Sequence, residues 1–314
     1  MKPLLLVLIP LTDDRKALID AVFEILYAPD AARRKAAIET EGARIRAVLT
    51  NGAVGLTAAE INALPALEFV SAIGAGYEKI DVAAAQARGI EVTNGSGTNA
   101  ACVADHVFAL LLATVRQVPT YDQAVRDGLF RDDLPLLPNF SGKKLGILGL
   151  GEIGREVAKR AAGFDLEIAY CNRRKRADVD YTYFDNIHAL ASWADYLVIA
   201  APGGAETFHL IDATVLQELG KQGYLVNIAR GSLVDSAALA DALHRGVIAG
   251  AGLDVYETEP APPTELLACP NLVIAPHVAG LSPEAFLAAD TRFVENGRKF
   301  FAGEQVSHSV LKAA

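Results

Sequence analysis

A short apolar run that leads into three closely spaced glycines constrains the fold of this chain more than any other feature. The run Lys144–Leu148 has the character of a buried strand, and a helical pattern covers Arg155–Ala162. Between them stand Gly149, Gly151 and Gly154. In such a unit the first glycine permits a tight turn, the second lets the backbone approach a pyrophosphate, and the third lets the helix pack closely on the strand. Because the helix N-terminus also offers N–H groups to an anion, we predict a dinucleotide-binding site. A purely structural glycine turn is the alternative.

Apolar runs and helical patterns alternate along the rest of the chain, as they do in parallel α/β sheets. The strands predicted before the glycine-rich stretch at residues 94–99 are Pro3–Leu11, Arg44–Thr50, Leu67–Ile73 and Ile90–Thr93. The helices predicted between them are Asp14–Ala28, Thr57–Leu64 and Asp81–Ala87, with a capping box at Thr57 and Glu60. The later strands are predicted at Lys144–Leu148, Leu166–Cys171, Tyr196–Ala200, Tyr224–Ile228, Gly250–Asp254 and Leu272–Ala275. The predicted fold class is α/β, with two Rossmann-like, doubly wound parallel-sheet domains.

The chain length predicts the number of domains, and two helices predict where their boundaries lie. A chain of 314 residues suggests two domains. The stretch 94–99 leads into a long apolar helix predicted at Ala101–Val118, so the first boundary is placed there. The last helix, Pro283–Phe301, is expected to return to the first domain. We therefore expect a discontinuous first domain, 1–98 plus 283–314, and a dinucleotide-binding domain, 99–282.

Charge and cysteine content limit the possible partners. The 29 Lys and Arg residues against 38 Asp and Glu residues give a net charge of −9, which disfavours nucleic acid and anionic membrane surfaces. The cysteines, Cys102, Cys171 and Cys269, are far apart, so neither a disulfide framework nor a metal site is predicted, and a reducing cytoplasm fits. Pro10 interrupts the N-terminal apolar run, which predicts a buried strand rather than a signal peptide. No other stretch reaches the roughly 18 apolar residues of a membrane span.

The end of the second strand of the glycine unit favours NADP(H). An NAD site usually has Asp or Glu there, about 20 residues after the glycines, to bind the ribose hydroxyls. Here the strand is followed instead by Asn172, Arg173, Arg174, Lys175 and Arg176. Arg173 can form a forked pair with a 2′-phosphate, Arg174 or Arg176 can supplement it, and Asn172 does not repel the anion. We predict that NADP(H) is preferred and that NAD(H) can also bind. The alternative interpretation of the basic segment is a solvated loop that binds no phosphate.

Ionisable side chains cluster at the carboxyl ends of three predicted strands. Arg230 follows the strand that ends at residue 228, Asp254 and Glu259 follow the next, and His277 follows the last. Ligands bind at this edge of an open parallel sheet. A guanidinium, one or two carboxylates and an imidazole are therefore expected to converge, which suits the reduction of a 2-keto acid.

With these motifs the chain resembles the D-2-hydroxyacid dehydrogenase family over nearly its whole length. Besides the glycine loop, the family's order and spacing are matched by Asn227-x-Ala229-Arg230-Gly231, Gly252-Leu253-Asp254-Val255-Tyr256-x-x-Glu259-Pro260 and Pro276-His277. Within the family the chain is most similar to the NADP-preferring glyoxylate/hydroxypyruvate reductase branch. That similarity lies in Asn172-Arg173-Arg174, Thr50-Asn51-Gly52 and Gly74-Ala75-Gly76-Tyr77.

The resemblance implies three catalytic residues. Arg230 would bind the substrate carboxylate and the keto oxygen and polarise the carbonyl. His277 would donate a proton to that oxygen in reduction, and a buried structural histidine is the alternative. Glu259 would hydrogen-bond the other imidazole nitrogen; a solvated glutamate is the alternative.

The resemblance also implies binding residues. The substrate carboxylate would meet the backbone N–H groups of Ala75 and Gly76, and the neighbouring loop would contribute Asn51 and Gly52. Asp254 would contact the nicotinamide carboxamide, or alternatively would cap the local turn. The cofactor-binding set would be Gly149, Gly151, Glu152, Ile153, Gly154, Asn172, Arg173, Arg174, Pro202, Ile228, Ala229, Arg230, Asp254, His277 and Gly280.

The implied function is NADPH-dependent reduction of a small 2-keto acid, glyoxylate or hydroxypyruvate, to the D-2-hydroxy acid. The alternatives are a reductase for a bulkier acid, such as an aryl-pyruvate or 2-ketogluconate, and a non-catalytic dinucleotide-sensing scaffold. The resemblance also implies a homodimer through Ala101–Val118. The apolar pattern of this helix fits an ordinary core helix equally well. No chemistry is assigned to the other histidines, which are placed on or near helices or the C-terminus: His106, His188, His209, His244 and His308.

Overall fold

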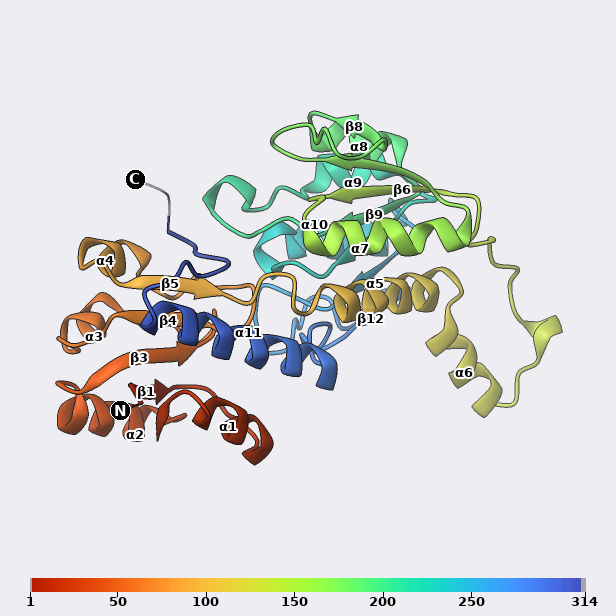
Figure 1. Cartoon of the computed structure of the whole chain (residues 1–314). Coiled ribbons are helices and arrows are strands. Elements are labelled where there is room, and N and C mark those ends of the chain that lie inside the picture. Colours follow the sequence, from red (N-terminus) through yellow and green to blue (C-terminus); the bar gives the residue numbers. More distant parts are fainter. Residues whose placement is uncertain (1, 312–314) are drawn as a thin grey trace. The chain divides into compact units, whose positions relative to one another are not determined.

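The protein consists of two α/β units, seen here in a computed structural model that describes residues 2–311 (Figure 1). Unit 1 is Met1–Asn99 with Leu281–Ala314, and unit 2 is Ala100–Gly280. Residue 1 and residues 312–314 of the expected first domain lie outside the described residues. Each unit has its own parallel sheet, so the predicted fold class is confirmed.

The sheet of unit 1 has the strand order β2-β1-β3-β4-β5 and is parallel throughout. Its strands are β1 (Leu4–Val7), β2 (Glu24–Tyr27), β3 (Ile45–Thr50), β4 (Phe69–Ala72) and β5 (Glu91–Asn94). Its helices are α1 (Asp13–Asp20), α2 (Ala31–Glu41), α3 (Ala58–Asn62), α4 (Val82–Ala87) and α11 (Pro283–Phe301). One buried cluster joins the sheet to α2, α3 and α4, and another joins its opposite face to α1 and α11. The last helix is therefore part of unit 1, where Phe293 stacks on Phe23 with a ring centroid distance of 5.2 Å.

Two sequence predictions in unit 1 need correction. The helix predicted at Asp14–Ala28 ends at Asp20, and β2 follows it. This segment contains Phe23, Ile25 and Tyr27, whose aromatic and β-branched side chains favour a strand once β1 is available as a partner. Helix α2 was not predicted; Asp30 caps it by accepting a hydrogen bond from the Arg33 N–H. The capping box at Thr57 is present as predicted.

The sheet of unit 2 is also parallel, in the order β12-β11-β10-β9-β6-β7-β8. Its strands are β6 (Lys144–Leu148), β7 (Glu167–Cys171), β8 (Thr182–Phe184), β9 (Tyr196–Ile199), β10 (Tyr224–Asn227), β11 (Gly250–Leu253) and β12 (Leu272–Ile274). The edge strand β8 was not predicted, because three residues are too short for an alternating pattern. The α-helices are α5 (Ala100–Val115), α6 (Val118–Arg126), α7 (Glu152–Ala161), α8 (Ile187–Trp193), α9 (Ala213–Leu219) and α10 (Ser236–His244). Short 3-10 turns lie at Arg131–Asp133, Ala162–Phe164, Ala205–Thr207 and Gly231–Leu233.

Both faces of the unit 2 sheet are covered, which explains why its strands are apolar at successive positions. On β9, Tyr196 and Val198 pack in the cluster with α5 and α7, whereas Leu197 and Ile199 pack in the cluster with α8, α9 and α10. Helices α5 and α7 lie side by side on their face (Figure 1).

Helix α5 covers most of the predicted Ala101–Val118 and packs within its own unit. Val103, Val107 and Leu111 are buried in the unit 2 core, as expected of a core helix. Among the described residues no single helix has the length and apolar content of a membrane span. Helices α5 and α6 reach that length and apolar content only when taken together, and they are bent by 53° relative to each other.

Candidate active site

The glycine loop of unit 2 has the geometry of a phosphate cradle. Gly149 has φ of +101°, and a Cβ atom there would stand 2.6 Å from the Ala201 nitrogen, so only glycine fits this turn. A Cβ at Gly154 would stand 2.3 Å from the Gly149 oxygen, so the absence of a side chain lets α7 approach β6. A Cβ at Gly151, the N-cap of α7, would meet nothing within 4 Å. The open space at the helix N-terminus is what a bound pyrophosphate needs, so these residues fit a dinucleotide.

The basic segment after β7 divides into two parts. Asn172 braces the glycine loop, since its Oδ1 accepts a hydrogen bond of 2.7 Å from the Leu150 N–H. Arg176 pairs with Asp178 at 3.1 Å, and the hydrogen bonds from Arg176 and then from Arg155 lower the pKa of Asp178 to about 2. Arg176 is therefore already neutralised. Arg173 and Arg174 are exposed at the tip of the strand, where they can reach an anion.

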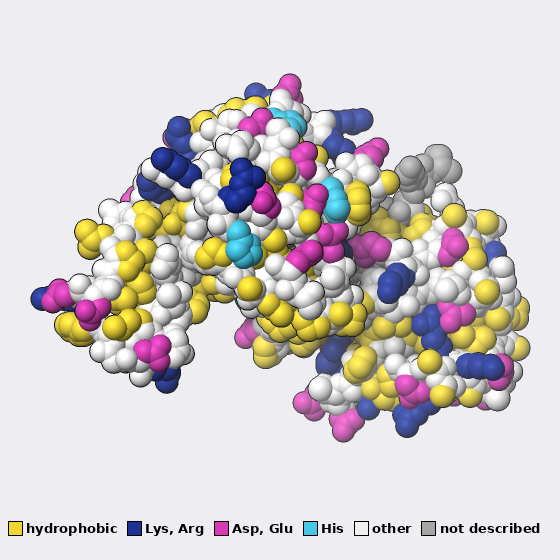
Figure 2. All heavy atoms as spheres, turned by 180° about the vertical axis from the view of Figure 1, so that it is seen from behind, with side chains coloured by type: hydrophobic (Ala, Val, Ile, Leu, Met, Phe, Trp, Pro, Cys, Tyr) yellow, Lys and Arg dark blue, Asp and Glu magenta, His cyan; other side chains and the backbone are white. Residues whose placement is uncertain are grey.

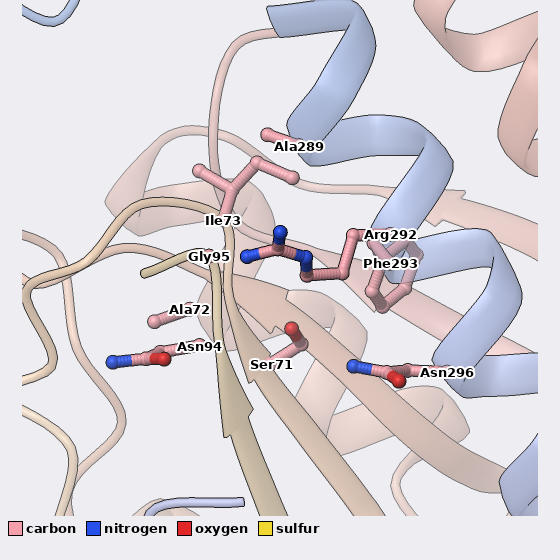
Figure 3. Close-up of a pocket in the computed structure, with 9 residues that line it drawn as sticks. All are labelled: Ser71, Ala72, Ile73, Asn94, Gly95, Ala289, Arg292, Phe293 and Asn296. Carbon is pink, nitrogen blue, oxygen red and sulfur yellow. The ribbon is translucent and has the colours of Figure 1, made fainter. Parts of the chain in front are cut away.

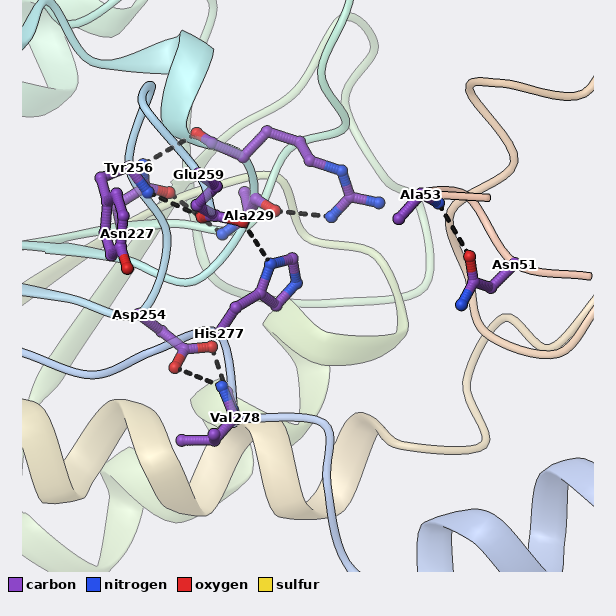
Figure 4. Close-up of polar contacts among 11 residues, drawn as sticks. Asn51, Ala53, Asn227, Ala229, Asp254, Tyr256, Glu259, His277 and Val278 are labelled. Atoms are coloured by element: carbon purple, nitrogen blue, oxygen red, sulfur yellow. Dashed lines mark hydrogen bonds and ion pairs between the residues drawn. The ribbon is translucent and has the colours of Figure 1, made fainter. Parts of the chain in front are cut away.

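His277 and Glu259 form a hydrogen-bonded pair at the carboxyl edge of the unit 2 sheet (Figure 4). His277 Nδ1 lies 2.7 Å from Glu259 Oε2. The other carboxylate oxygen of Glu259 accepts a hydrogen bond of 2.8 Å from the Tyr256 N–H, which fixes the carboxylate. The imidazole is half exposed, so its Nε2 is the atom that can exchange a proton with a ligand. A carboxylate on Nδ1 orients the ring.

The buried side chain of Asn227 shapes the turn that carries Arg230. Asn227 Oδ1 accepts from the Ala229 N–H at 3.0 Å, and its Nδ2 donates to the Arg230 carbonyl at 2.9 Å. Arg230 Nη1 donates to the Ala229 carbonyl at 2.6 Å. A Cβ atom at Gly231 would stand only 2.1 Å from the Tyr256 carbonyl carbon, so this turn packs directly on the segment that leads to Glu259.

Asp254 caps the turn that carries His277. Its carboxylate is buried, with one oxygen accepting from the Val278 N–H at 2.8 Å and the other from the Ala279 N–H at 3.0 Å. Sequence reasoning missed a neighbour of this carboxylate, His106. The Nε2 atom of His106 lies 3.5 Å from Asp254 Oδ1.

The other cofactor residues named from the sequence lie at the same edge of unit 2. Glu152 and Ile153 begin α7, Pro202 follows β9, Ile228 and Ala229 follow β10. Gly280 follows the His277 turn and closes the unit. Within residues 2–311, no group of three or more His, Cys, Asp or Glu side chains could hold a metal ion.

Unit 1 brings together four of the five residues predicted to bind substrate, all except Arg230. Asn51 closes a turn after β3, since its Oδ1 accepts from the N–H groups of residues 53 and 54 at 3.0 and 2.8 Å. A Cβ atom at Gly52 would stand 2.8 Å from the Gly76 carbonyl, so the two loops are in contact. Among the described residues, neither the Ala75 nor the Gly76 N–H group donates a hydrogen bond. Two adjacent N–H groups without acceptors can bind a carboxylate.

A small recess beside these loops is lined by β4, β5 and α11 (Figure 3). Arg292 points into it from α11 and donates to the Ser96 carbonyl. Asn94 donates to the Ala75 carbonyl at 2.8 Å, and the Gly95 N–H donates to the Gly74 carbonyl at 2.8 Å. The loops that follow β4 and β5 are thereby tied to each other and to α11.

Two other histidines of unit 2, His209 and His188, contact glutamate side chains. His209 is not in a helix: it has φ of +50°, and its Nε2 lies 2.6 Å from Glu257 Oε1. Burial raises the pKa of Glu257, but the hydrogen bonds from Ser236 and His209 outweigh it and lower the pKa. His188 lies 2.8 Å from Glu218 on the surface.

The sequence is similar to a family of dehydrogenases and to several reductases of known name. Residues 108–279 match the family described as D-isomer specific 2-hydroxyacid dehydrogenase, NAD binding domain. The chain is 38% identical to hydroxyphenylpyruvate reductase of Plectranthus scutellarioides over 309 residues, 98% of each chain. It is 37% identical to a glyoxylate/hydroxypyruvate reductase of Arabidopsis thaliana over 307 residues, again 98% of each.

The fold is similar to that of a solved NADPH-dependent glyoxylate/hydroxypyruvate reductase from Sinorhizobium meliloti, in complex with NADP and malonate. The TM-score is 0.88, with 35% sequence identity and all of both chains covered.

Proposed function

Since the chain belongs to the D-isomer specific 2-hydroxyacid dehydrogenase family, we propose that it reduces the small 2-keto acids glyoxylate and hydroxypyruvate to D-2-hydroxy acids, with NADPH as the reductant. The family makes it an NAD(P)-dependent oxidoreductase. The observation that carries the proposal is the His277–Glu259 pair, in which Nδ1 and Oε2 are 2.7 Å apart. This pair belongs to unit 2, which also contains Arg230.

The roles of the catalytic side chains follow from their chemistry. A bound nicotinamide dinucleotide supplies the hydride. Arg230 binds the substrate carboxylate and keto oxygen, so that its positive charge stabilises the negative charge that develops on the oxygen. His277 Nε2 gives its proton to that oxygen, which completes the alcohol. Glu259 holds the ring in place and stabilises the imidazolium from which the proton leaves.

We assign the dinucleotide to unit 2, and to unit 1 the backbone groups that bind the substrate together with Arg230. Unit 2 is the dinucleotide-binding domain, because its glycine loop is open at the N-terminus of α7. Unit 1 is the substrate-binding domain, where the N–H groups of Ala75 and Gly76 bind the substrate carboxylate. Asn51 and Gly52 support that loop, Gly52 through its close approach to Gly76.

Two relatives favour different substrate sizes, and a substrate panel decides between them. NADPH oxidation is measured with glyoxylate, hydroxypyruvate, hydroxyphenylpyruvate and 2-ketogluconate. Highest kcat/KM with one of the first two acids supports the proposal. Highest kcat/KM with a bulkier acid assigns the chain to the substrate class named for its Plectranthus relative or to 2-ketogluconate. No turnover with any acid supports a dinucleotide-sensing scaffold.

We infer a preference for NADP(H), and Arg173→Ala tests it. Loss of a charge-assisted pair with the 2′-phosphate removes about 1.5–3 kcal/mol, so KM for NADPH is expected to rise about 10- to 100-fold. NADH lacks this phosphate and serves as the internal control, with its kcat/KM unchanged. Steady-state kinetics with both cofactors check this. An unchanged ratio of the two kcat/KM values in the variant contradicts the assignment, as does a wild-type enzyme that uses NADH equally well.

We also propose a cytoplasmic homodimer. The predicted interface, Ala101–Val118, consists mostly of helix α5, whose large apolar side chains are mostly buried. We therefore place the contact on the large apolar side chains exposed on α6 and on the segment that follows it: Val118, Val125, Leu129, Phe130 and Leu136. They gather on the lobe at the left of Figure 2. A second copy of the chain would remove this surface from water. Light scattering after size exclusion is expected to give twice the mass of one chain, and the mass of one chain contradicts the dimer.

A further inference from the structure

The turn that carries His277 is held almost entirely by one buried residue, Asp254. The Asp254 carbonyl accepts from the His277 N–H at 2.8 Å. Its two carboxylate oxygens accept from Val278 and Ala279, at 2.8 and 3.0 Å. Three consecutive N–H groups are thus bound to a single residue. His277 itself has φ of +55°, a conformation that side chains with a Cβ rarely adopt, so the turn depends on this external support.

The Asp254 carboxylate in turn faces His106, which is on α5. The side chain of Asp254 is 1% exposed and that of His106 is 23% exposed. The His106 Nε2 atom is buried and forms no hydrogen bond with any residue between 2 and 311. It lies 3.5 Å from Asp254 Oδ1, within the range of an ion pair but beyond a well-formed hydrogen bond.

The Asp254 carboxylate and the His106 imidazole can each supply a hydrogen-bond partner to the other. A carboxylate has about four lone-pair positions, and the N–H groups of Val278 and Ala279 occupy two of them. A buried carboxylate is unstable unless opposite charge or further hydrogen bonds compensate for its loss of water. A buried imidazole nitrogen without a partner is destabilising in the same way. If the distance between His106 Nε2 and Asp254 Oδ1 shortens slightly, a hydrogen bond forms that gives both atoms a partner.

We propose that His106 is a positioning residue for His277, acting through Asp254. The His106 Nε2–H donates to Asp254 Oδ1 and fixes the carboxylate beneath the turn, and the carboxylate fixes the backbone of residues 277–279. This inference rests on the proposed role of His277 as proton donor. His106 touches none of the reacting atoms in this scheme. Its effect is on where the His277 ring stands.

The test compares His106→Phe, which keeps a ring but removes the donor, with His106→Gln, whose Nε2 can replace the imidazole nitrogen. In His106→Phe we expect kcat to fall about 10- to 100-fold, because a misplacement of about 1 Å has an effect of that size. KM for the 2-keto acid and for NADPH is expected to stay within about twofold. His106→Gln is expected to restore most of the kcat. His188→Phe, at a surface histidine of the same unit, is the matched control and should match the wild type.

Hydrogen exchange of the amides at positions 277–279 gives a readout that does not require turnover. In His106→Phe these amides are expected to lose protection while the strands of unit 2 keep theirs and Tm is nearly unchanged. Exchange that stays at the wild-type rate overturns the proposal. So does a loss of protection throughout unit 2, or a failure of His106→Gln to restore either readout, since both indicate a packing role only. A wild-type protein without 2-keto acid turnover refutes the proposed function, and the exchange data still decide whether His106 holds the turn.

Discussion

Replacing His277 with alanine is expected to lower kcat for 2-keto acid reduction by about 10²- to 10⁴-fold, the usual contribution of a positioned general acid. The keto oxygen must gain a proton as it becomes an alcohol, and in the variant water has to supply it. The Nδ1 side of the ring makes no contact with substrate in this scheme, since Glu259 occupies it at 2.7 Å. Binding of NADPH, measured by fluorescence titration, is expected to change little. The rate is measured from NADPH oxidation at saturating substrate.

The surface pair of His188 and Glu218 offers a matched control for this experiment. Its distance of 2.8 Å is close to that of the His277–Glu259 pair, and it lies in the same unit. His188→Ala is expected to leave kcat unchanged. Glu259→Gln keeps a hydrogen-bond acceptor but loses the charge, so its kcat is expected between those of the wild type and His277→Ala. Undiminished reduction by His277→Ala would show that the proton comes from another group.

The parts of the fold that the sequence predicts well are those encoded within one or two turns of chain. The glycine loop is an example, because the backbone conformation of Gly149 and the close approach at Gly154 are properties of adjacent elements. The capping box at Thr57 is another, since both of its hydrogen bonds join residues three positions apart. Interior strands with apolar residues on both faces, such as β6 and β10, were also recognised.

The two strands that were missed, β2 and β8, lie at the edges of their sheets, and each depends on a single neighbouring strand. Strand β2 has four residues and pairs only with β1, and β8 has three residues and pairs only with β7. Local propensity is a weak guide to such short edge strands, because the neighbouring strand supplies most of their stability.

The same reason explains what was missed at the site. His106 is one of a few polar residues in the largely apolar helix α5, beside Asp105 and Thr114, and the sequence contains no signal of what it faces. Its contact with Asp254 exists because α5 packs across β11, where a Cβ atom at Gly252 would stand 2.9 Å from the Leu110 Cβ. Only the odd polarity of that position in the α5 pattern could have raised the question.

Replacing Arg230 with alanine is expected to lower kcat/KM for the 2-keto acid by about 10³-fold, close to 4 kcal/mol of transition-state stabilisation. The guanidinium acts on the substrate carboxylate in the ground state and on the keto oxygen as charge develops, so both KM and kcat are expected to deteriorate. Steady-state kinetics over a wide range of substrate concentration separate the two effects. NADPH affinity is expected to be nearly unaffected.

Arg230→Lys distinguishes charge from geometry at this position. A lysine keeps the positive charge, but it cannot bind the carboxylate and the keto oxygen with one planar fork, so it is expected to recover only a small part of the lost kcat/KM. Arg245→Ala is the matched control, because this exposed arginine pairs with Asp241 at 2.9 Å on the surface of α10. If Arg230→Lys restored the wild-type rate, bidentate binding would be refuted and a point charge would suffice. If Arg230→Ala kept the wild-type kcat/KM, Arg230 would not be needed for substrate binding, and the N–H groups of Ala75 and Gly76 would bind the carboxylate without it.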